Sequence, residues 1–575
     1  MIEPRRSVDP TEGVPTEDAP TEDTPTKDAG AFERPLFNVF AEFAASQPDH
    51  LAVDDGTARM TYANLHDQAL ALGARIAALV PEDGLVGVLV PTSVLCPMAW
   101  LACLAARRTF LPLDPHLPAA RNQAIVAEAG LAAVIVPATP TELTAWLPTG
   151  LARIPLTAEP DPQRLPTSPN LPPAKVGMVL FTSGSTGRPK GIALLERTAL
   201  CKVMNYRATC GLGPRDGLLS LHPPPTGAGA TDILAALLCG ASLFLTDLKR
   251  DGLARSLALL CDSGITMCFA VPAVARALLA MDGAADAFRG LRIMRLAGDV
   301  IMDSDIAAMA HRLAPSARIL IAFGTTETGG ALMQRLIDPS APIETGRVAM
   351  GTPVAGHAVS VEDANGNPAR PGETGELVVR GRYVALGHWI GGQLDPIAFP
   401  ADPAHPGSRC FRTGDMVVLR PDGMIVPAGR GDRQVKINGM RVEPADLETA
   451  LRGLPDVADA AVLVHGTAAA PALVAFVVPV PAARVARTSA QLARGWRSAL
   501  ATRLPPQLIP ARFHMVPAIP LLPSLKPDFA ALRALLAAKD APGMLAGVRI
   551  WLRGRRQRNL AVRVRSKGRP DGAAP

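Results

Sequence analysis

The chain has 575 residues, of which 48% are hydrophobic and 19% charged, with 50 glycines and 56 prolines. This length provides about two to four domains with sizeable cores, and the composition excludes a collagen, a disordered protein and a small disulfide-bonded scaffold. The net charge is +6, but residues 541–575 carry eight arginines and one lysine against one aspartate, while residues 1–30 carry eight acidic and three basic residues. The basic excess therefore belongs to a C-terminal tail and does not indicate a nucleic-acid-binding core.

The N-terminal residues 1–30 repeat P-T-E-D and P-T-K-D units and contain few large apolar side chains. Such a segment cannot bury enough surface to offset its chain entropy, so we expect a disordered acidic leader. The segment lacks the apolar core of a secretory signal, and the eight cysteines of the chain form no C-x-x-C pair. These features predict a cytoplasmic protein with reduced thiols.

From residue 32 onwards, short apolar runs alternate with helix-like stretches. We expect strands at residues 86–90, 133–136, 176–181, 191–195 and 319–323, and helices at residues 62–79, 93–106, 230–239 and 272–281. This alternation predicts an α/β protein whose strands are buried on both faces. Residues 85–106 are uncharged and long enough to span a bilayer, but Pro91 and Pro97 favour a buried strand, a turn and a buried helix.

A different pattern begins near residue 410. Two apolar runs, 416–419 and 424–426, flank P-D-G and predict a hairpin. Beyond the G-R-G-D of residues 429–432, we expect a helix at 444–454, strands at 460–465 and 472–478, and a helix at 489–504. We therefore predict four parts: a leader 1–30, a large domain 31–431, a small α+β domain 432–540 and a basic tail 541–575.

The strongest motif is F-T-S-G-S-T-G-R-P-K-G at residues 181–191, between two strand-like runs. Its hydroxyls and glycines can surround phosphate groups with N–H and O–H donors. It is not a Walker A loop, because G-x-x-x-x-G-K-[ST] is absent and a strand follows. The chain has nine lysines against 49 arginines, so Lys190 at the end of this loop is notable. The alternative, a Ser/Gly surface linker, is disfavoured by the buried runs on both sides.

This motif and those downstream resemble the motifs of the adenylate-forming (AMP-binding) superfamily, which includes acyl-CoA synthetases, peptide-synthetase adenylation domains and luciferases. The others are F-G-T-T-E-T at residues 323–328, F-R-T-G-D at 411–415, G-R-G-D-R-Q-V-K-I-N-G-M-R-V-E at 429–443, and Lys526 within 520–532. They follow the family's order, so the resemblance covers about residues 32–535. It implies an α/β fold with a large N-terminal domain of stacked β-sheets and helices, plus a small mobile α+β C-terminal domain.

The resemblance implies activation of a carboxylate by ATP and Mg²⁺, giving an acyl-adenylate and pyrophosphate. Negative charge crowds the transferring phosphoryl group, so catalysis needs cations and fixed donors. Glu327 would bind Mg²⁺, because hard ions prefer carboxylate oxygens, and Thr326 would contact the α-phosphate. The implied nucleotide-binding residues are Thr182, Ser183, Gly184, Ser185, Thr186, Gly187, Lys190, Gly298, Phe323, Gly324, Thr325, and, at the ribose, Asp415 and Arg430.

Lys526 matches the catalytic lysine of the family, whose ammonium would lie between the carboxylate and the α-phosphate. The family usually has glycine before this lysine, whereas this chain has Leu525, and Pro527 follows. The alternative is a solvent-facing lysine in a proline-rich loop.

Asp432 matches the family's hinge, and rotation of the small domain would present Lys436 and Gly439 for thioester formation. F-L-P-L-D-P at residues 110–115, and Q-V-K-I and R-V-E within residues 434–443, resemble the peptide-synthetase branch. The sequence contains neither a G-G-x-S carrier motif nor a condensation H-H-x-x-x-D-G. We expect a stand-alone adenylation enzyme whose thiol acceptor is the phosphopantetheine of a separate carrier protein.

The substrate side is less regular. Adenylation domains for α-amino acids usually carry an aspartate for the substrate ammonium, and this chain has Gly227 there, with Asp232 five residues later. A buried ammonium without a carboxylate is costly, so either another acid serves or the substrate lacks an α-ammonium. The candidate pocket residues are His222, Gly227, Ala270, Ala297 and Ile321. They predict a mostly apolar pocket, with His222 either at its mouth or in a structural role.

We therefore predict a ligase of non-ribosomal peptide or other secondary-metabolite biosynthesis that activates a carboxylic acid, with an amino acid as the expected substrate. An acyl- or aryl-CoA ligase that uses free CoA is one alternative, and a non-catalytic binding protein that keeps the fold is another. Residues 548–565 alternate arginine with apolar side chains and could fold on a carrier, an acidic lipid surface or RNA. We favour a solvated tail, and we expect no membrane span and no nucleic-acid partner.

Overall fold

The computed structural model describes residues 32–139, 142–156, 176–183, 189–262, 264–430, 435–437, 440–442, 444–467, 470–501, 509–522 and 525–540. The predicted leader 1–30 and tail 541–575 lie outside these residues. Contacts divide the chain into two compact units, residues 1–413 with 417–427, and residues 414–416 with 428–575. Among the described helices, none combines the length and the hydropathy that crossing a membrane requires.

The first unit contains a nine-stranded sheet with the order β15-β14-β13-β12-β11-β9-β10-β1-β2. Its strands are β1 (Leu51–Asp54), β2 (Arg59–Thr61), β9 (Gly217–Ser220), β10 (Ser242–Leu245), β11 (Met267–Ala270), β12 (Ile293–Ala297), β13 (Arg318–Thr325), β14 (Gly330–Ile337) and β15 (Thr352–Pro353). Strands β9, β11, β12 and β13 run parallel and are largely buried, which agrees with the predicted α/β class, although only β13 was among the expected strands. Their carboxyl ends meet at one edge, which is where open α/β sheets bind ligands.

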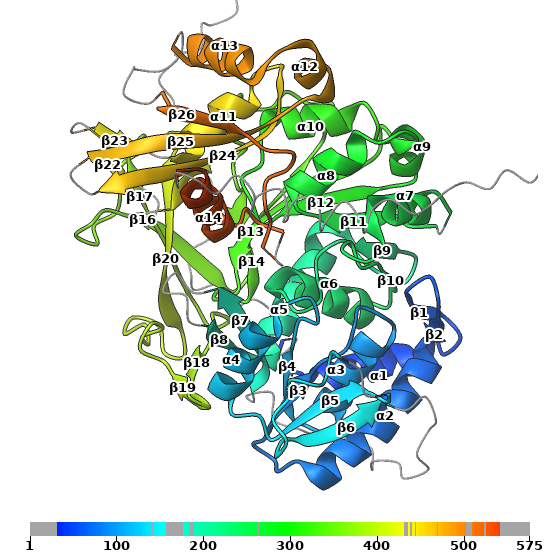
Figure 1. The fold of residues 1–575 in the computed structure, drawn as a ribbon. Coiled ribbons are helices and arrows are strands. Elements are labelled where there is room, and N and C mark those ends of the chain that lie inside the picture. The colour runs from blue at the N-terminus through cyan, green and yellow to red at the C-terminus, as the bar shows by residue number, and fades with distance from the viewer. Residues whose placement is uncertain are drawn as a thin grey trace, which may run out of the picture. The chain divides into compact units, whose positions relative to one another are not determined.

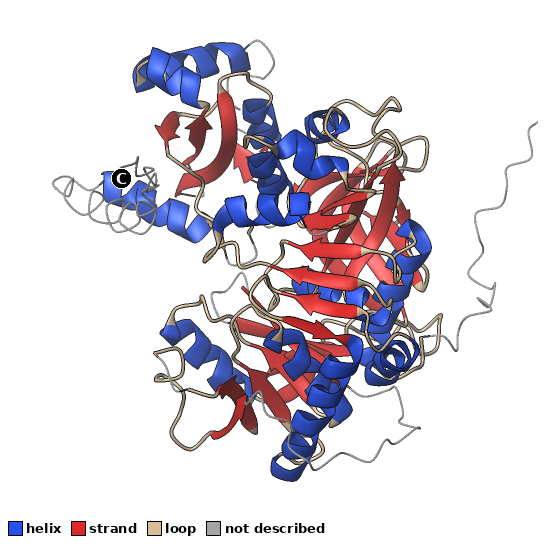
Figure 2. Cartoon of the chain, turned by 90° about the vertical axis from the view of Figure 1, so that its right-hand side faces the viewer, coloured by secondary structure: helices blue, strands red, loops and turns tan. Residues whose placement is uncertain are grey.

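Two groups of helices pack beside this sheet (Figures 1 and 2). They comprise α5 (Glu196–Cys210) with α6 (Gly227–Leu238), and α7 (Gly252–Asp262) with α8 (Pro272–Leu279), α9 (Ala284–Arg289) and α10 (Asp303–Ala310). Helix α5 contacts β14 of this sheet and also β7 and β8 of the next, so it lies between two sheets. Helix α6 begins at Gly227 because the Thr226 hydroxyl accepts the Gly229 N–H at 3.1 Å and caps the helix.

The second sheet of this unit has eight strands in the order β19-β18-β8-β7-β4-β3-β5-β6. They are β3 (Leu85–Val88), β4 (Thr109–Pro112), β5 (Ala133–Pro137), β6 (Ala152–Leu156), β7 (Val176–Ser183), β8 (Pro189–Leu195), β18 (Gly387–Ile390) and β19 (Gln393–Asp395). The helices α1 (Leu36–Ser46), α2 (Tyr62–Leu79), α3 (Leu95–Ala105) and α4 (Ala119–Ala129) belong to this half. The uncharged run 85–106 is strand β3 followed by the buried helix α3, as predicted.

A four-stranded sheet with the order β16-β17-β20-β21 completes the larger part of the chain. Its strands are β16 (His357–Glu362), β17 (Thr374–Gly381), β20 (Arg409–Leu419) and β21 (Ile425–Arg430). The predicted P-D-G turn joins β20 and β21, where the Gly423 N–H donates to the Arg420 carbonyl at 3.0 Å and Gly423 has φ +78°.

The second unit is a small α+β fold, as predicted. It contains β22 (Val435–Ile437), β23 (Met440–Val442), β24 (Val457–Thr467), β25 (Ala470–Pro479), β26 (Arg512–Met515), α11 (Pro444–Arg452), α12 (Pro481–Ala486), α13 (Ser489–Ala501) and α14 (Phe529–Asp540). Strands β24, β25 and β26 form a sheet with one core around Leu447 and Trp496 and another around Leu532 and Leu536. This unit therefore has its own hydrophobic core.

Candidate active site

The strongest sequence motif lies at the end of the β7–β8 hairpin. In this antiparallel ladder Thr182 is paired with Lys190, and Ser183 with Pro189. Directly paired residues share a face of the sheet, so the Thr182 hydroxyl and the Lys190 ammonium flank one end of the loop. The predicted loop residues Gly184, Ser185, Thr186 and Gly187 lie outside the described residues, as does the side chain of Ser183.

The second motif is a tight turn at the carboxyl end of β13. The Thr325 N–H donates to the Thr328 hydroxyl at 3.0 Å, and that hydroxyl donates to the Gly330 carbonyl at 2.7 Å. Gly324 is required, because a Cβ there would lie 1.9 Å from the Gly330 oxygen. The Gly329 N–H donates to the Thr326 carbonyl at 2.9 Å. These bonds fix the backbone that carries Thr326 and Glu327.

His388 on β18 links the first two motifs. Strand β18 pairs with β8, and the Glu327 carbonyl accepts the Ala385 N–H at 3.0 Å. Burial lowers the pKa of His388, the positive charge of Lys190 lowers it further, and the carboxylate of Glu327 raises it. Lys190 and Glu327, which lie far apart in the sequence, therefore act on one imidazole. Sequence reasoning missed His388, which stands in none of the motifs.

Gly298 and Phe323 lie at the ends of neighbouring parallel strands. Gly298 follows β12 with φ +93°, a conformation that favours glycine. Phe323 belongs to β13 and packs, partly buried, against the main core. Both predicted nucleotide residues are thus at the carboxyl edge of the nine-stranded sheet.

The R-T-G-D motif is part of β20. Arg412 donates to Glu362 of β16 at 2.8 Å and to Glu376 of β17 at 2.7 Å. These ion pairs connect β20 to both strands. Gly414 has φ +72°, and the half-buried Asp415 follows it. Arg430 ends β21, and its side chain lies outside the described residues.

Lys526 lies in a loop of the second unit with an exposed side chain. Its carbonyl accepts the Leu522 N–H at 2.7 Å, and the Leu522 carbonyl accepts the Leu525 N–H at 2.9 Å. Leu525 has φ +62°, the left-handed region that glycine adopts easily. Leu525 therefore adopts, with strain, the backbone conformation that a glycine would adopt easily. The loop thus follows the path that the family's glycine would allow.

The predicted hinge and thioester residues are described only in part. Asp432 and Gly439 lie outside the described residues. Lys436 lies on β22, where it pairs with Arg441 of β23, and its side chain is not described. Their roles stay predictions.

Gly227 lies against the second motif. A Cβ at Gly227 would come within 2.8 Å of the Thr326 hydroxyl oxygen, so a larger residue there would displace that side chain. Gly227 stands where we predicted the aspartate of amino-acid adenylation domains, and a side chain at this position would require Thr326 to move.

Asp232 is fully buried and engaged by three side chains. It accepts hydrogen bonds from Ser220 at 2.8 Å, His222 Nδ1 at 2.7 Å and Arg295 at 2.8 Å. The Arg295 guanidinium also lies over the Tyr206 and Phe269 rings at 5.0 and 4.9 Å. Asp232 is therefore not an open partner for a substrate ammonium, and sequence reasoning did not anticipate Arg295.

The strand registers separate the other predicted pocket residues. Ala297 pairs with Ala322, whereas Ile321 pairs with Leu296, which in turn pairs with Ala270. Because side chains alternate along a strand, Ala297 lies on one face of the sheet and Ala270 and Ile321 on the other. The structure thus brings Ala297 to the face of Arg295 and does not bring Ile321 there.

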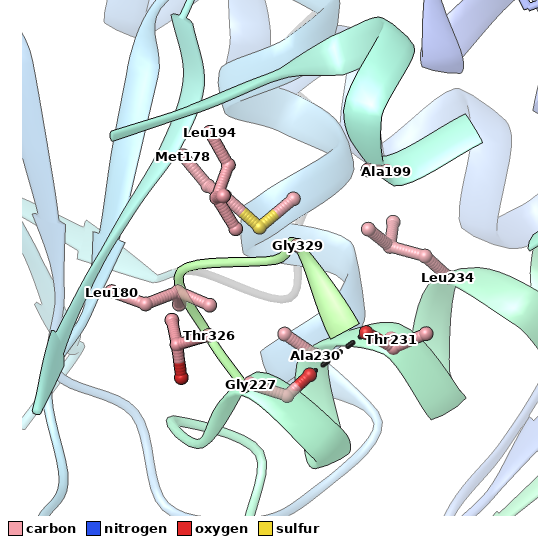
Figure 3. A pocket seen from close by; sticks show the side chains of 10 residues that line it. All are labelled: Met178, Leu180, Leu194, Ala199, Gly227, Ala230, Thr231, Leu234, Thr326 and Gly329. Carbon is pink, nitrogen blue, oxygen red and sulfur yellow. Dashed lines mark hydrogen bonds between the residues drawn. The ribbon is translucent and has the colours of Figure 1, made fainter. Parts of the chain in front are cut away.

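A small cavity lies where the second motif meets helices α5 and α6 (Figure 3). Gly227, Thr231, Thr326 and Gly329 supply its polar edge, and apolar side chains from β7, β8, α5 and α6 close it. It has room for about one water molecule. Figure 3 shows the bond, 2.8 Å long, from the Thr231 hydroxyl to the Gly227 carbonyl.

Comparison with known proteins decides the family. A model described as AMP-binding enzyme matches residues 40–389, and one described as the AMP-binding enzyme C-terminal domain matches residues 446–526. This chain belongs to the AMP-binding enzyme family. It is an adenylate-forming ligase, and its two units correspond to the fold that the sequence motifs implied.

Individual relatives of this AMP-binding enzyme come from natural-product pathways. It is 35% identical over 511 residues to the "Probable non-canonical nonribosomal peptide synthetase (NRPS) CymA" of Salinispora arenicola, covering 86% of this chain and 6% of that one. It is 31% identical to "Novobiocin biosynthesis protein H" of Streptomyces niveus, covering 83% and 80% of the two chains. The structure of Klebsiella oxytoca NpsA in complex with 3-hydroxyanthranilyl-AMSN superposes with a TM-score of 0.72 at 24% identity, covering 88% and 99% of the two chains.

The hydroxyls, the lysine and the carboxylate that the first unit brings together fit a nucleotide with bound Mg²⁺. Thr182 and Lys190 offer a hydroxyl and a cation, and the Thr325 hydroxyl oxygen is buried without a hydrogen-bond partner in the described part of the chain. Such an orphaned group is satisfied when a phosphate oxygen accepts its proton. Glu327 supplies a carboxylate of the kind that Mg²⁺ prefers, and bound Mg²⁺ would neutralise charge on the phosphate oxygens.

Proposed function

We propose that this AMP-binding enzyme joins the carboxylate of an acid to the α-phosphate of ATP, releases pyrophosphate, and passes the acyl group to the phosphopantetheine thiol of a separate carrier protein. The observation that carries the proposal is that one segment joins the hairpin of Lys190 to the turn of Thr326 and Glu327: the Ala385 N–H donates to the Glu327 carbonyl at 3.0 Å, and β18, which follows, pairs with β8. This arrangement gathers a cation, a carboxylate and hydroxyl donors where phosphate charge must be held.

Each group has a distinct task in this proposal. Lys190 and Thr182 would hold the terminal phosphates, and Thr326 would donate to the α-phosphate as charge develops there. Lys526 would hold the carboxylate against the phosphorus, a task that suits a compact charge on a flexible stem. His388 would stay neutral at physiological pH, because burial and Lys190 both lower its pKa. A neutral imidazole adds no further positive charge to Lys190.

The substrate side favours an acid that does not need a carboxylate at position 227. Gly227 lies against Thr326, and Asp232 already balances Arg295. An α-amino acid, the substrate expected from the sequence, would have to place its ammonium elsewhere. Hydroxy and aryl acids satisfy the observed arrangement without that cost.

The proposal has two forms, which differ in the acceptor thiol: the phosphopantetheine of a carrier protein or free CoA. CymA is named as a nonribosomal peptide synthetase and the second relative as a novobiocin biosynthesis protein, which supports a carrier protein as acceptor. An acyl- or aryl-CoA ligase would instead use free CoA. We place either reaction in the cytoplasm, where ATP and both thiols are available.

The test is acid-dependent exchange of labelled pyrophosphate into ATP, screened over amino, hydroxy, fatty and aryl acids. We expect at least one acid to support exchange that depends on Mg²⁺. The accepted acid is then offered with free CoA or with a phosphopantetheinylated carrier, and we expect thioester formation on the carrier. Exchange with no acid contradicts adenylation, and faster transfer to CoA favours the CoA ligase.

A further inference from the structure

A buried polar cluster lies at the carboxyl edge of the nine-stranded sheet. We define the His222 cluster as Ser220, His222, Asp232 and Arg295, in which Asp232 accepts from the other three. The side chains of His222, Asp232 and Arg295 are 2%, 0% and 4% exposed. Burying these groups is costly unless each is satisfied.

Two nitrogens of this cluster stay unsatisfied by the described residues, Arg295 Nε, whose guanidinium lies over the Tyr206 and Phe269 rings, and Nε2 of the His222 imidazole. His222 Nε2 is buried and has no hydrogen-bond partner among the residues that the structure describes. A buried polar atom without a partner usually costs about 1–3 kcal/mol, so its presence needs an explanation.

The charges of the cluster define what Nε2 can do. A carboxylate only accepts hydrogen bonds, so Nδ1 carries the proton that His222 donates to Asp232. The single negative charge of Asp232 is already balanced by Arg295 at 2.8 Å. In the tautomer whose single proton is on Nδ1, Nε2 offers a lone pair. The group that fits it is a hydrogen-bond donor.

The position of the cluster connects it to the reaction site. The Leu221 N–H donates to the Phe269 carbonyl at 2.9 Å, which places His222 beside the end of β11. Arg295 lies two residues before Ala297 on β12, on the same face of the sheet. Asp232 comes from α6, whose first residue, Gly227, approaches Thr326. The cluster therefore lies on the elements that carry the proposed acid site.

We propose that His222 is a specificity-determining residue, whose Nε2 accepts a hydrogen bond from a hydroxyl or an uncharged (aryl) amino group on the acid substrate. This inference rests on the proposed adenylation and narrows its substrate class to acids with such a donor in addition to the reacting carboxyl group. Asp232 and Arg295 act through His222 as positioning residues, because they fix its tautomer and its orientation.

The experiment measures pyrophosphate exchange with matched acids. Benzoate is compared with its hydroxy- and amino-substituted forms, and phenylpropionate with phenyllactate. We expect wild-type kcat/KM to be about ten- to hundredfold higher for one donor-bearing acid than for its parent. Parent acids that match or exceed every substituted form overturn the inference without affecting adenylation.

Two substitutions separate the two nitrogens of His222. Asn places an amide nitrogen near Nδ1 and keeps the bond to Asp232, whereas Gln places a polar atom near Nε2. We expect His222→Asn to reduce the preference to about one and His222→Gln to keep most of the preference. A preference that survives in a folded His222→Asn variant overturns the inference.

Ser220→Ala is the matched control for a purely structural role. It removes one hydrogen bond to Asp232 and leaves Nε2 in place. We expect a lower melting temperature and an unchanged preference. If Ser220→Ala reduces the preference as much as His222→Asn does, the cluster acts only as support and the inference is wrong. Absence of exchange with every acid contradicts adenylation itself, and the inference with it.

Discussion

The two units divide the proposed chemistry between binding and catalysis. The first unit contains Thr182, Lys190, Thr326 and Glu327, held by a hairpin and a hydrogen-bonded turn. The second unit contains Lys526 in an exposed loop that follows its own compact core. The proposed phosphate contacts thus belong to the larger unit, whereas the proposed catalytic lysine and the predicted ribose residues Asp415 and Arg430 belong to the smaller. Variants in the two units should therefore have separable effects.

The units also differ in how they bury charge. The first unit buries Asp232 and Arg295, whereas the pair Asp456–Arg487 of the second unit is 28% and 50% exposed. We expect Asp232→Ala to lower the free energy of unfolding by about 3–5 kcal/mol, because it leaves Arg295 buried without a counterion. Asp456→Ala should cost less than about 1 kcal/mol. Urea unfolding measures both, and equal losses would contradict this contrast.

Lys526→Ala separates catalysis from binding. We expect its exchange rate to fall about a hundred- to a thousandfold, because in the proposed reaction the lysine contacts charge that develops in the transition state. The dissociation constant for ATP should stay within about twofold, since its phosphate contacts belong to the first unit. Lys249→Ala, at an exposed lysine outside every motif, is the control. Near-normal exchange by Lys526→Ala would refute the assignment.

Lys202 gives the first unit a pH-dependent stability. Burial lowers its pKa from 10.5 to about 8, and its ammonium lies 2.9 Å from His357 Nε2. Between these two pKa values the unfolded chain binds more protons at this lysine, so the contribution of Lys202 to stability rises with pH from about 8 to 10.5, by roughly 3 kcal/mol. Lys202→Met should remove this rise. Urea unfolding at several pH values measures it, and parallel pH profiles for variant and wild type would contradict it.

Leu525 gives the smallest expected effect. Because φ is +62°, Leu525→Gly should change the free energy of unfolding by less than about 1 kcal/mol and keep exchange within about threefold. Leu525→Val should be worse by about 1–2 kcal/mol, since a β-branched residue is strained in the left-handed region. Exchange by both variants, with their melting temperatures, tests whether this loop needs its glycine-like path.

Much of the fold could be predicted, because local signals and tertiary packing agree. Helix α2 spans Tyr62–Leu79 as expected, since Thr61 accepts the Asn64 N–H and caps it. Helix α6 begins three residues before the expected start at residue 230, because Thr226 caps a glycine-rich turn that apolar periodicity does not reveal. Boundaries were thus predictable where capping and hydrophobicity coincide.

The site was predictable where residues are contiguous. The residues of the hairpin and of the turn could be named from sequence. His388 could not, because only the pairing of β18 with β8 brings it to Lys190. The sequence gives no local signal for Arg295 either. An arginine inside an apolar strand can be assigned a role only once the fold shows that Asp232 of α6 accepts its hydrogen bond. The face on which Ile321 lies depends on strand register, which sequence alone does not reveal.

Transfer of labelled oxygen tests adenylate formation most directly. An acid that supports exchange is prepared with heavy oxygen in its carboxylate and incubated with the enzyme, ATP, Mg²⁺ and an acceptor thiol. Attack of the carboxylate on the α-phosphorus, followed by thiol attack on the acyl carbon, leaves one labelled oxygen on AMP. Our account predicts labelled AMP together with pyrophosphate. Unlabelled AMP, or ADP with inorganic phosphate, would contradict it.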